Sequence, residues 1–558
     1  MANLPVPLSG LDAAFLYLET PQMPMHVGAL HTFALPPGYR GDFVADVRKH
    51  MMARAHLAAP LGRKLLALPL NLATPSWVSA RVDFDKHVTA VKLPRLARGS
   101  NGMAEAEALV SKLHSVLLER DRPLWRFYVL SGFKPLADGS SVFGLYTKLH
   151  HAAVDGQAAV ALAQATLDLQ ATGRQLDAPI VLPRSARQGL AQQLGGALAY
   201  QMRQVVDLAK ALPGTAKAVG GALGQKAASS ALDGAASARD AMLEAATRAA
   251  HKWIEGIEVR DAKGRALAGS TRNLTIAPRT PFNATVGRKR AFATVSLPLA
   301  ELKLLRQAFD ATLNDVVLAI CSGALRSYLQ AHDALPKAPL IAAVPVSLRA
   351  KGDTSASNQA SMSVVSLGTH LSTPARRVAH IKEATAAMKT ALLNLKSVMP
   401  TDFPTLGVPW LLTGLTALYG RGRLADRIPP LANVVISNVP GPLVPLYMAG
   451  GRMLTNHPSS IVVHGVALNI TVQTYAGALD FGLMACAKAM PDVATFAEAI
   501  HTSHAELLKL AQRQLAKGQP APVARKRAQK STAKSVAEEA RTKSRRKPRS
   551  PLVAGVGR

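Results

Sequence analysis

Short runs of alternating apolar and polar residues occur along the first third of the chain, between longer runs in which apolar residues recur every three or four positions. The first pattern is typical of strands and the second of helices. Residues 125–130 and 142–149 follow the strand pattern, whereas residues 103–118 follow the helical pattern. This part of the chain therefore predicts an α/β arrangement.

A second region with a mixed pattern begins near residue 276. Two strand-like runs, residues 290–297 and 340–347, flank a helix whose apolar stripe comprises Val316, Ile320, Ala324 and Tyr328. Two further β-rich runs between residues 460 and 485 meet at Ala476 and Gly477, which is typical of a hairpin. We expect these elements to form a second α/β body.

Composition changes twice along the chain. Residues 185–275 are rich in alanine and poor in aromatic residues, which predicts a helical crossover arm. Between residues 517 and 558 there are thirteen Lys or Arg, two Glu and no aromatic residue, which predicts a disordered basic tail over residues 516–558. The arm and the tail would flank an N-terminal lobe, residues 1–184, and a C-terminal lobe, residues 276–515.

The chain is strongly basic, with 66 Lys and Arg against 35 Asp and Glu and a formal charge of +31. Such a charge attracts a phosphorylated cofactor, an anionic lipid surface or nucleic acid. For the tail we favour a lipid surface, because no aromatic residue is interleaved for base stacking, and nucleic acid remains an alternative. At 558 residues and 48% hydrophobic content, the chain predicts two or three folded domains.

Targeting and redox signals are few. Cys321 and Cys486 each lie in an apolar stretch, which predicts buried reduced thiols and no cysteine-based metal site. The first residues show no secretory leader, and the uncharged stretch 403–420 is interrupted by Pro and Gly. That stretch suits a buried helix, the lining of an apolar tunnel or a dip into a lipid interface. We expect a cytoplasmic protein without a transmembrane segment, peripheral at the inner membrane face or on lipid inclusions.

The sharpest chemical signal follows the predicted strand 142–149. His150, His151, Asp155 and Gly156 form the pattern HHxxxDG directly before a helix-like run. Successive side chains of a strand point to opposite faces, so only one histidine can face a cavity. An imidazole with a pKa of about 6.5 is suited to accept a proton from a hydroxyl near neutral pH. One histidine is therefore the candidate base and the other its support, and two ordinary polar histidines are the alternative.

Asp155 and Gly156 fall at the predicted helix start. Aspartate there caps the helix, and the positive helix end favours a neutral imidazole nearby. The N–H group of Gly156 is a candidate donor to a developing oxyanion.

HHxxxDG resembles the active-site motif of coenzyme A-dependent acyltransferases and condensation domains. Its companions make the chain similar to the bacterial wax ester synthase/diacylglycerol acyltransferase family, from about residue 8 to about 510. These companions are LSGLDAAFLYLETPQMPMHVG at residues 8–28, PLW at 123–125, PRTPFN at 278–283, LNDVVLA at 313–319, PVSLR at 345–349 and SNVPGP at 437–442.

The resemblance implies a two-lobe, condensation-domain-like acyltransferase fold, with mixed sheets, flanking helices and a solvent channel between the lobes. It implies acyl-CoA as co-substrate, no permanently bound cofactor or metal, and diacylglycerol or a fatty alcohol as acceptor. The products would be triacylglycerol, wax esters or both. Two alternatives are a condensing enzyme with a carrier-bound acyl donor and a non-catalytic lipid-surface or polyanion-binding protein. The acceptor, acyl-chain length, oligomeric state and tail partner stay open.

The resemblance also assigns roles to the motif. His151 would be the general base and His150 its support. Asp155 would hold the shape of the motif, and we take Arg349 as its first candidate partner because an Arg–carboxylate pair fixes geometry well.

Two further pairs are candidates for the substrate channel by the same resemblance. Asn314 and Asp315 also fit a capping pattern that starts at Thr312, so capping and a site role stand as alternatives. Ser437 and Asn438 would lie near the channel, although their sequence, followed by Pro and Gly, also suits a structural turn.

Overall fold

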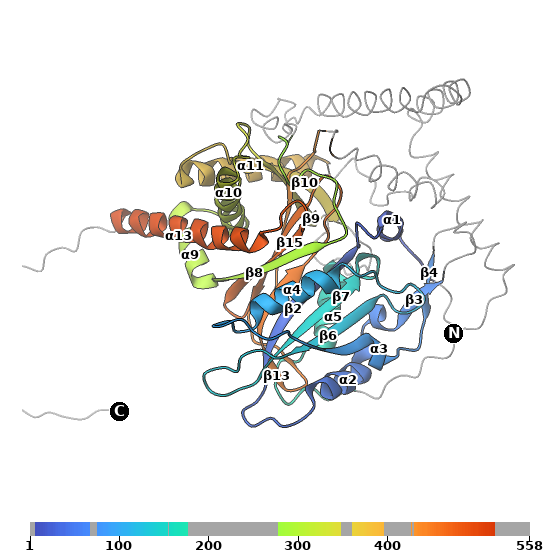
Figure 1. Cartoon of the computed structure of the whole chain (residues 1–558). Coiled ribbons are helices and arrows are strands. Elements are labelled where there is room, and N and C mark those ends of the chain that lie inside the picture. Colours follow the sequence, from blue (N-terminus) through green and yellow to red (C-terminus); the bar gives the residue numbers. More distant parts are fainter. Residues whose placement is uncertain are drawn as a thin grey trace, which may run out of the picture. The chain divides into compact units, whose positions relative to one another are not determined.

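The computed structural model describes residues 6–66, 75–154, 156–176, 277–347, 360–395, 426 and 429–518. Contacts divide the chain into two units, Met1–Ala511 and Gln512–Arg558. The first unit is a mixed α/β structure with two six-stranded sheets and one three-stranded sheet (Figure 1). The predicted arm, residues 185–275, lies outside the described residues.

The first six-stranded sheet has the order β12-β13-β2-β7-β6-β5. Its strands are β2 (His26–Ala34), β5 (Val88–Lys92), β6 (Trp125–Ser131), β7 (Val142–His150), β12 (Tyr447–Met448) and β13 (Gly451–Ser459). The helices α2 (Phe43–Arg54), α3 (Phe84–His87), α4 (Met103–His114) and α5 (Gly156–Thr166) belong to the same part of the chain. The strands predicted at residues 125–130 and 142–149 are confirmed, and the helix predicted from residue 103 ends at His114, four residues early.

One strand of this sheet comes from the distant end of the sequence. β13 pairs antiparallel with β2, placing Asn456 opposite His31. The hydroxyls of Thr32 and Thr455 lie 2.8 Å apart across the pair. A strand pattern carries no information about its partner, so the sequence did not predict this exchange between the two halves. The predicted lobe boundaries remain a prediction.

The second six-stranded sheet has the order β10-β9-β11-β14-β15-β8. Its strands are β8 (Arg290–Pro298), β9 (Ile341–Ser347), β10 (Ala360–Ser366), β11 (Val434–Val439), β14 (Leu468–Tyr475) and β15 (Ala478–Cys486). Four helices pack against it: α9 (Leu299–Phe309), α10 (Leu313–Ala331), α11 (Pro374–Leu395) and α13 (Val493–Gly518) (Figure 1). The helix α13 extends three residues into the predicted tail, and the rest of the tail lies outside the described residues.

The core of this second body follows the sequence pattern. The predicted stripe on α10 is buried and joins the largest hydrophobic cluster: Val316, Ile320, Ala324 and Tyr328. The predicted hairpin is β14–β15, and both turn residues have positive φ, 39° at Ala476 and 95° at Gly477. Its first strand begins only at Leu468, because the preceding residues form turns and a single bridge between Val463 and Val466.

The two sheets are joined where α4 lies against β8, the edge strand of the second sheet (Figure 1). Glu107 Oε1 accepts a hydrogen bond from the N–H of Thr294 at 2.8 Å. One helical turn later, Ser111 Oγ accepts from the N–H of Phe292 at 2.9 Å. Side chains of a helix thus satisfy edge N–H groups that would otherwise lack a partner strand.

The third sheet is small, and its strand β1 directly precedes the amino-terminal helix. It comprises β1 (Val6–Pro7), β4 (Ser76–Ser79) and β3 (Arg63–Leu66), and the 3-10 helices η1 (Ala55–Leu57) and η2 (Ala59–Leu61) precede β3. The helix α1 (Gly10–Leu18) begins at the cap residue Ser9, whose hydroxyl accepts from the N–H of Asp12 at 3.1 Å.

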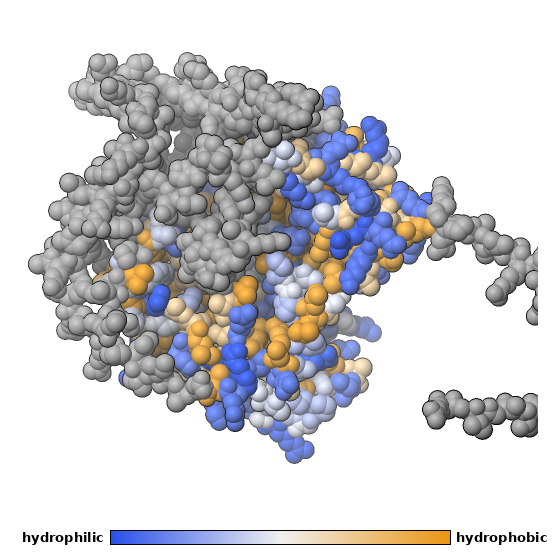
Figure 2. Space-filling view, turned by 180° about the vertical axis from the view of Figure 1, so that it is seen from behind, coloured by the Kyte–Doolittle hydropathy of each residue, from blue (hydrophilic) through white to orange (hydrophobic). Residues whose placement is uncertain are grey.

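Among the described residues, no single helix is long and apolar enough to cross a membrane; α9 and α10 together meet the length and composition criteria but bend by 98°. The candidate stretch 403–420 lies outside those residues. Hydrophobic and hydrophilic residues are interspersed on the face seen in Figure 2. Both cysteines, Cys321 and Cys486, are buried free thiols, as predicted.

Candidate active site

The HHxxxDG motif occupies the predicted junction between a strand and a helix. β7 ends at His150, the 3-10 helix η4 (His151–Ala153) follows, and α5 begins at Gly156. His150 caps η4, because its Nδ1 accepts from the N–H of Ala152 at 3.0 Å. Asp155 lies outside the described residues.

The two histidines of the motif have different environments. His150 is fully buried, whereas His151 is partly exposed. The ring of His151 stacks on Phe15 of α1. The backbone N–H of His151 donates to the carbonyl of Met25 at 2.8 Å. Of the two rings, that of His151 is therefore the more accessible to solvent.

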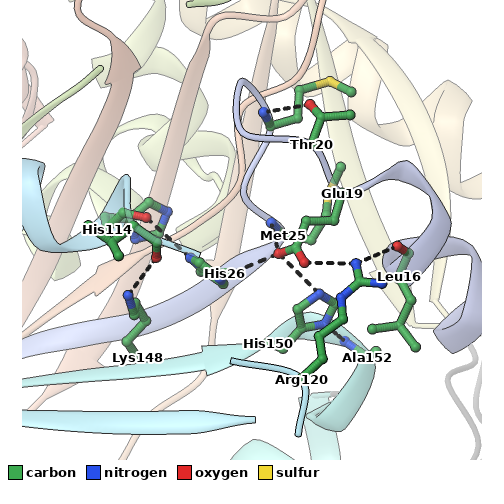
Figure 3. A network of polar contacts seen from close by, with 12 residues as sticks. Leu16, Glu19, Thr20, Met25, His26, His114, Arg120, Lys148, His150 and Ala152 are labelled. Atoms are coloured by element: carbon green, nitrogen blue, oxygen red, sulfur yellow. Dashed lines mark hydrogen bonds and ion pairs between the residues drawn. The ribbon is translucent and has the colours of Figure 1, made fainter. Parts of the chain in front are cut away.

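The buried carboxylate of Glu19 lies next to the ring of His150 (Figure 3). Glu19 Oε1 lies 3.3 Å from His150 Nε2 and 3.4 Å from His26 Nε2. The same oxygen accepts from the N–H of Met25 at 3.3 Å, and Oε2 accepts from Arg120 Nη2 at 2.9 Å. The Glu19 side chain is only 2% exposed. The carboxylate of Glu19 therefore contacts two imidazoles, a guanidinium and a backbone amide.

Electrostatics keep this carboxylate ionised. Burial alone raises the pKa of Glu19, but hydrogen bonding from His150, the fields of the two histidines and hydrogen bonding from Arg120 outweigh it and lower the pKa to about 2. Burial, together with the charge of Lys148, lowers the pKa of His26 to about 3. At neutral pH we therefore expect Glu19 to be anionic.

Hydrogen bonds from His26 and Lys148 connect this cluster to the end of α4 (Figure 3). His26 Nδ1 lies 3.1 Å from the carbonyl of His114 and donates to it. Lys148 Nζ donates to the carbonyls of Leu113 and Val116 at 2.9 and 2.8 Å, where the helix dipole favours a cation. Burial, reinforced by the charge of Arg126, lowers the pKa of Lys148 to about 7. The strand that carries the motif is thus anchored to a helix end.

The remaining predicted residues lie on the second sheet and its helices. Asp315 completes a capping box at the start of α10: its Oδ2 accepts from the N–H and hydroxyl of Thr312, and Oδ1 accepts from the hydroxyl of Thr385 at 2.7 Å. Asn314, beside it in the first turn, is partly exposed. The capping alternative for this pair is therefore borne out for Asp315.

Ser437 and Asn438 lie within β11 and pair with Thr471 and Val472 of β14. Both are partly buried strand residues, because β11 continues to Val439, two residues beyond the end expected at Ser437. Arg349 is outside the described residues.

The sequence motif did not reveal Glu19, His26, Arg120 or Phe15. Three of them lie inside the opening segment 8–28, where the only local signal is an acidic residue that directly follows an apolar helix. The contact between Glu19 and His150 joins residues more than a hundred positions apart, which no linear pattern shows. Among the described residues, no group of three or more His, Cys, Asp or Glu is arranged to hold a metal ion.

Comparisons with known proteins identify the family of the chain. Residues 8–260 and 255–317 match the wax ester synthase/diacylglycerol acyltransferase catalytic domain, and residues 356–508 match the corresponding C-terminal domain. A putative diacylglycerol O-acyltransferase of Mycobacterium tuberculosis is 35% identical over 509 residues, which are 90% of this chain and 99% of that protein. A probable diacylglycerol O-acyltransferase of the same organism is 34% identical over 489 residues, covering 86% of this chain and 94% of that protein.

A solved structure is similar as well. The wax ester synthase/diacylglycerol acyltransferase from Marinobacter aquaeolei VT8 has a TM-score of 0.60 and 27% sequence identity to this chain. The match covers 91% of this chain and 100% of that one. The similarity thus extends over both sheets described above.

Proposed function

The chain belongs to the wax ester synthase/diacylglycerol acyltransferase family, and from this membership we infer that it is an acyl-CoA-dependent O-acyltransferase. It makes triacylglycerol from diacylglycerol, wax esters from long-chain alcohols, or both. The observation that carries this conclusion is the match to both family domains around an HHxxxDG motif, of which His151 is partly exposed. The fold is the mixed α/β acyltransferase fold expected from the sequence.

His151 is the general base of the reaction that we propose. Its neutral imidazole takes the proton of the acceptor hydroxyl as the oxygen attacks the thioester carbonyl carbon. The new C–O bond forms, the C–S bond breaks, and the imidazolium returns the proton to the thiolate of coenzyme A. The products are an ester and free coenzyme A, without an acyl-enzyme intermediate. A positioned base contributes a factor of about 10²–10⁴ to the rate.

Neighbouring groups support this step. The first N–H groups of a helix have no intrahelical acceptor, so we assign the N–H of Gly156, at the start of α5, to the developing oxyanion. We assign Asp155 to holding the motif, with Arg349 as its partner. Ser437 and Asn438 are proposed to border the acyl or acceptor channel from the second sheet.

The strong positive charge favours binding to negatively charged substrates and lipid surfaces. Both substrates are amphiphilic, and acyl-CoA carries several phosphates. A formal charge of +31 attracts those phosphates and also anionic lipid headgroups. We propose peripheral contact with an anionic membrane face or lipid inclusion.

Purified enzyme, palmitoyl-CoA and either diolein or hexadecanol test this function. Release of free coenzyme A and separation of the lipid products report the reaction and its acceptor together. We expect ester formation from acyl-CoA without a carrier protein, and a loss of about 10²-fold or more in His151→Ala. His56→Ala, at an exposed histidine of η1, is the matched control.

Three other results would change the conclusion. Ester formation that survives in His151→Ala would remove the base assignment. A requirement for a carrier-bound acyl donor would favour a condensing enzyme. No ester from the wild type with either acceptor would favour a non-catalytic lipid-surface protein.

A further inference from the structure

Glu19 and the N–H of Ala152 contact the ring of His150 from two sides. The Nδ1 of His150 accepts from the N–H of Ala152, so in the neutral ring the proton lies on Nε2. That nitrogen faces Glu19 Oε1 at 3.3 Å (Figure 3). One ring nitrogen therefore accepts from η4, and the other lies at ion-pair distance from the carboxylate. Arg120 fixes the carboxylate in turn, because its Nη2 donates to Glu19 Oε2 at 2.9 Å and to the carbonyl of Leu16 at 2.8 Å.

Two backbone connections lead from this carboxylate to His151. The first is His150 itself, whose side chain caps the 3-10 helix that begins at His151. The second is Met25, whose N–H donates to Glu19 while its carbonyl accepts from the N–H of His151 at 2.8 Å. The backbone position of His151 thus depends on groups that Glu19 holds from two sides.

A third connection acts on the ring of His151. Phe15 precedes Glu19 by four residues, one helical turn, and its ring lies flat on the imidazole of His151. Arg120 binds Glu19 and the Leu16 carbonyl together, so it also fixes the end of α1 that carries Phe15. The segment from Phe15 to Met25 therefore controls both the backbone and the ring plane of His151.

We propose that Glu19 is a positioning residue for acyl transfer, which acts through His150 and Met25 to keep the imidazole of His151 in its reactive orientation. The proposal rests on the function assigned to His151 above. Glu19 does not touch the reacting atoms, so its loss should lower kcat and leave the KM for acyl-CoA unchanged. A misplacement of about 1 Å at a reacting group costs a factor of about 10².

The decisive variants separate positioning from folding. Glu19→Gln keeps the size of the side chain and removes its charge. His150→Asn keeps an acceptor for the N–H of Ala152 and removes the nitrogen that faces Glu19. Glu301→Gln is the matched control, because Glu301 Oε2 lies 3.4 Å from His504 Nε2 on a helix of the second sheet. For each variant we would measure kcat, KM for palmitoyl-CoA and the thermal midpoint.

We expect Glu19→Gln to lose about 10²-fold in kcat with KM within twofold, and Glu301→Gln to keep wild-type kcat. The double variant Glu19→Gln/His150→Asn should lose less than the product of the two single losses, because both changes break one contact. Folded Glu19→Gln with wild-type kcat would overturn the proposal, as would a double variant whose loss equals that product.

Two further measurements cover the remaining cases. If Glu19→Gln does not fold, Glu19→Asp replaces it: the charge beside Arg120 stays, but the side chain is one methylene too short to hold His150. The same loss in kcat is expected, and wild-type kcat in folded Glu19→Asp would overturn the proposal. His151→Ala is assayed alongside: if it is inactive while Glu19→Gln is fully active, only the positioning role fails. If His151→Ala is active, the base assignment fails and the positioning role fails with it.

Discussion

The imidazole of His151 lies flat against the phenyl ring of Phe15, with ring centroids 4.0 Å apart and an angle of 17° between the ring planes. The stack restricts rotation of the imidazole about its side-chain bonds. A base that takes a proton from a bound hydroxyl depends on such restriction, because the acceptor nitrogen must point at the hydroxyl. The helix α1, far from the motif in sequence, thus supplies one side of the site.

Replacing Phe15 with leucine should lower kcat without unfolding the protein. The substitution keeps an apolar side chain but removes a ring stack worth about 0.5–1.5 kcal/mol, which corresponds to about a 2- to 10-fold loss in rate. Steady-state assays with palmitoyl-CoA check this value. Phe84→Leu, at a ring that packs near Trp125, is the control and should keep wild-type kcat. Equal kcat in both variants would show that the stack does not orient the base.

Asp315 should prove to be a stability residue. Asp315→Ala removes the acceptor for Thr312 and Thr385 at the start of α10, and capping losses of this kind cost about 1–2 kcal/mol. We expect a lower thermal midpoint with kcat/KM within twofold at a permissive temperature. Asn314→Ala, its neighbour, separates the two interpretations of this pair. A large loss of kcat/KM in Asp315→Ala with an unchanged thermal midpoint would instead place Asp315 in the channel.

Local patterns predicted the features that depend on neighbouring residues. The alternation over residues 142–149 predicted β7, and the apolar stripe from Val316 predicted the buried face of α10. Gly477 predicted the hairpin turn, because glycine readily adopts the positive φ that this turn requires, whereas the positive φ of Ala476 is uncommon for alanine. Alternation also predicted that the two histidines of the motif would have different environments.

Features that join distant segments were beyond the reach of these patterns. β13 belongs to the first sheet although it follows β11 of the second in sequence, because strand pairing depends on global topology. Likewise, the position of Glu19 beneath His150 follows from the packing of α1 onto η4. An isolated glutamate is ordinarily exposed, so nothing in the local sequence pointed to a buried one.

Gly28 should tolerate no side chain. It lies in β2 opposite Lys148 of β7, and a Cβ there would come within 1.7 Å of the carbonyl oxygen of Thr147. Because that oxygen belongs to the backbone, relief requires separating the two strands that carry His26 and His150. We expect Gly28→Ala to lower the free energy of unfolding by about 3 kcal/mol or more. The thermal midpoint and the soluble yield should fall together.

Gly62→Ala is the control for this substitution. A Cβ at Gly62 meets nothing within 4 Å, and its φ of −110° suits any residue. It should leave the thermal midpoint almost unchanged. A Gly28→Ala variant as stable as Gly62→Ala would mean that β2 and β7 are farther apart than the structure shows.

Glu107, at the junction of α4 and β8, should make stability depend on pH. Burial raises its pKa to about 7, although hydrogen bonds from Thr294 act in the opposite direction. In the unfolded chain the carboxyl of Glu107 has its ordinary pKa of 4.5, so between pH 4.5 and 7 the folded protein holds a proton that the unfolded chain releases. The stability associated with protonated Glu107 is therefore complete below pH 4.5 and is lost as the pH rises through about 7.

Glu107→Gln should remove this dependence, because glutamine keeps the acceptor for Thr294 and has no proton to lose. Between pH 5 and 8 the free energy of unfolding of the variant should rise relative to that of the wild type. The difference between the two proteins should reach on the order of 3 kcal/mol. Thermal midpoints of both proteins across this range measure the difference and cancel the effects of all other titrating groups. Glu105→Gln, on the same helix, is the control. Hydrogen bonding from Ser100 lowers the pKa of Glu105, so removing this carboxylate should not raise the free energy of unfolding as the pH rises. A constant difference between wild type and Glu107→Gln would show that Glu107 is ionised throughout this range and that the junction is not sensitive to pH.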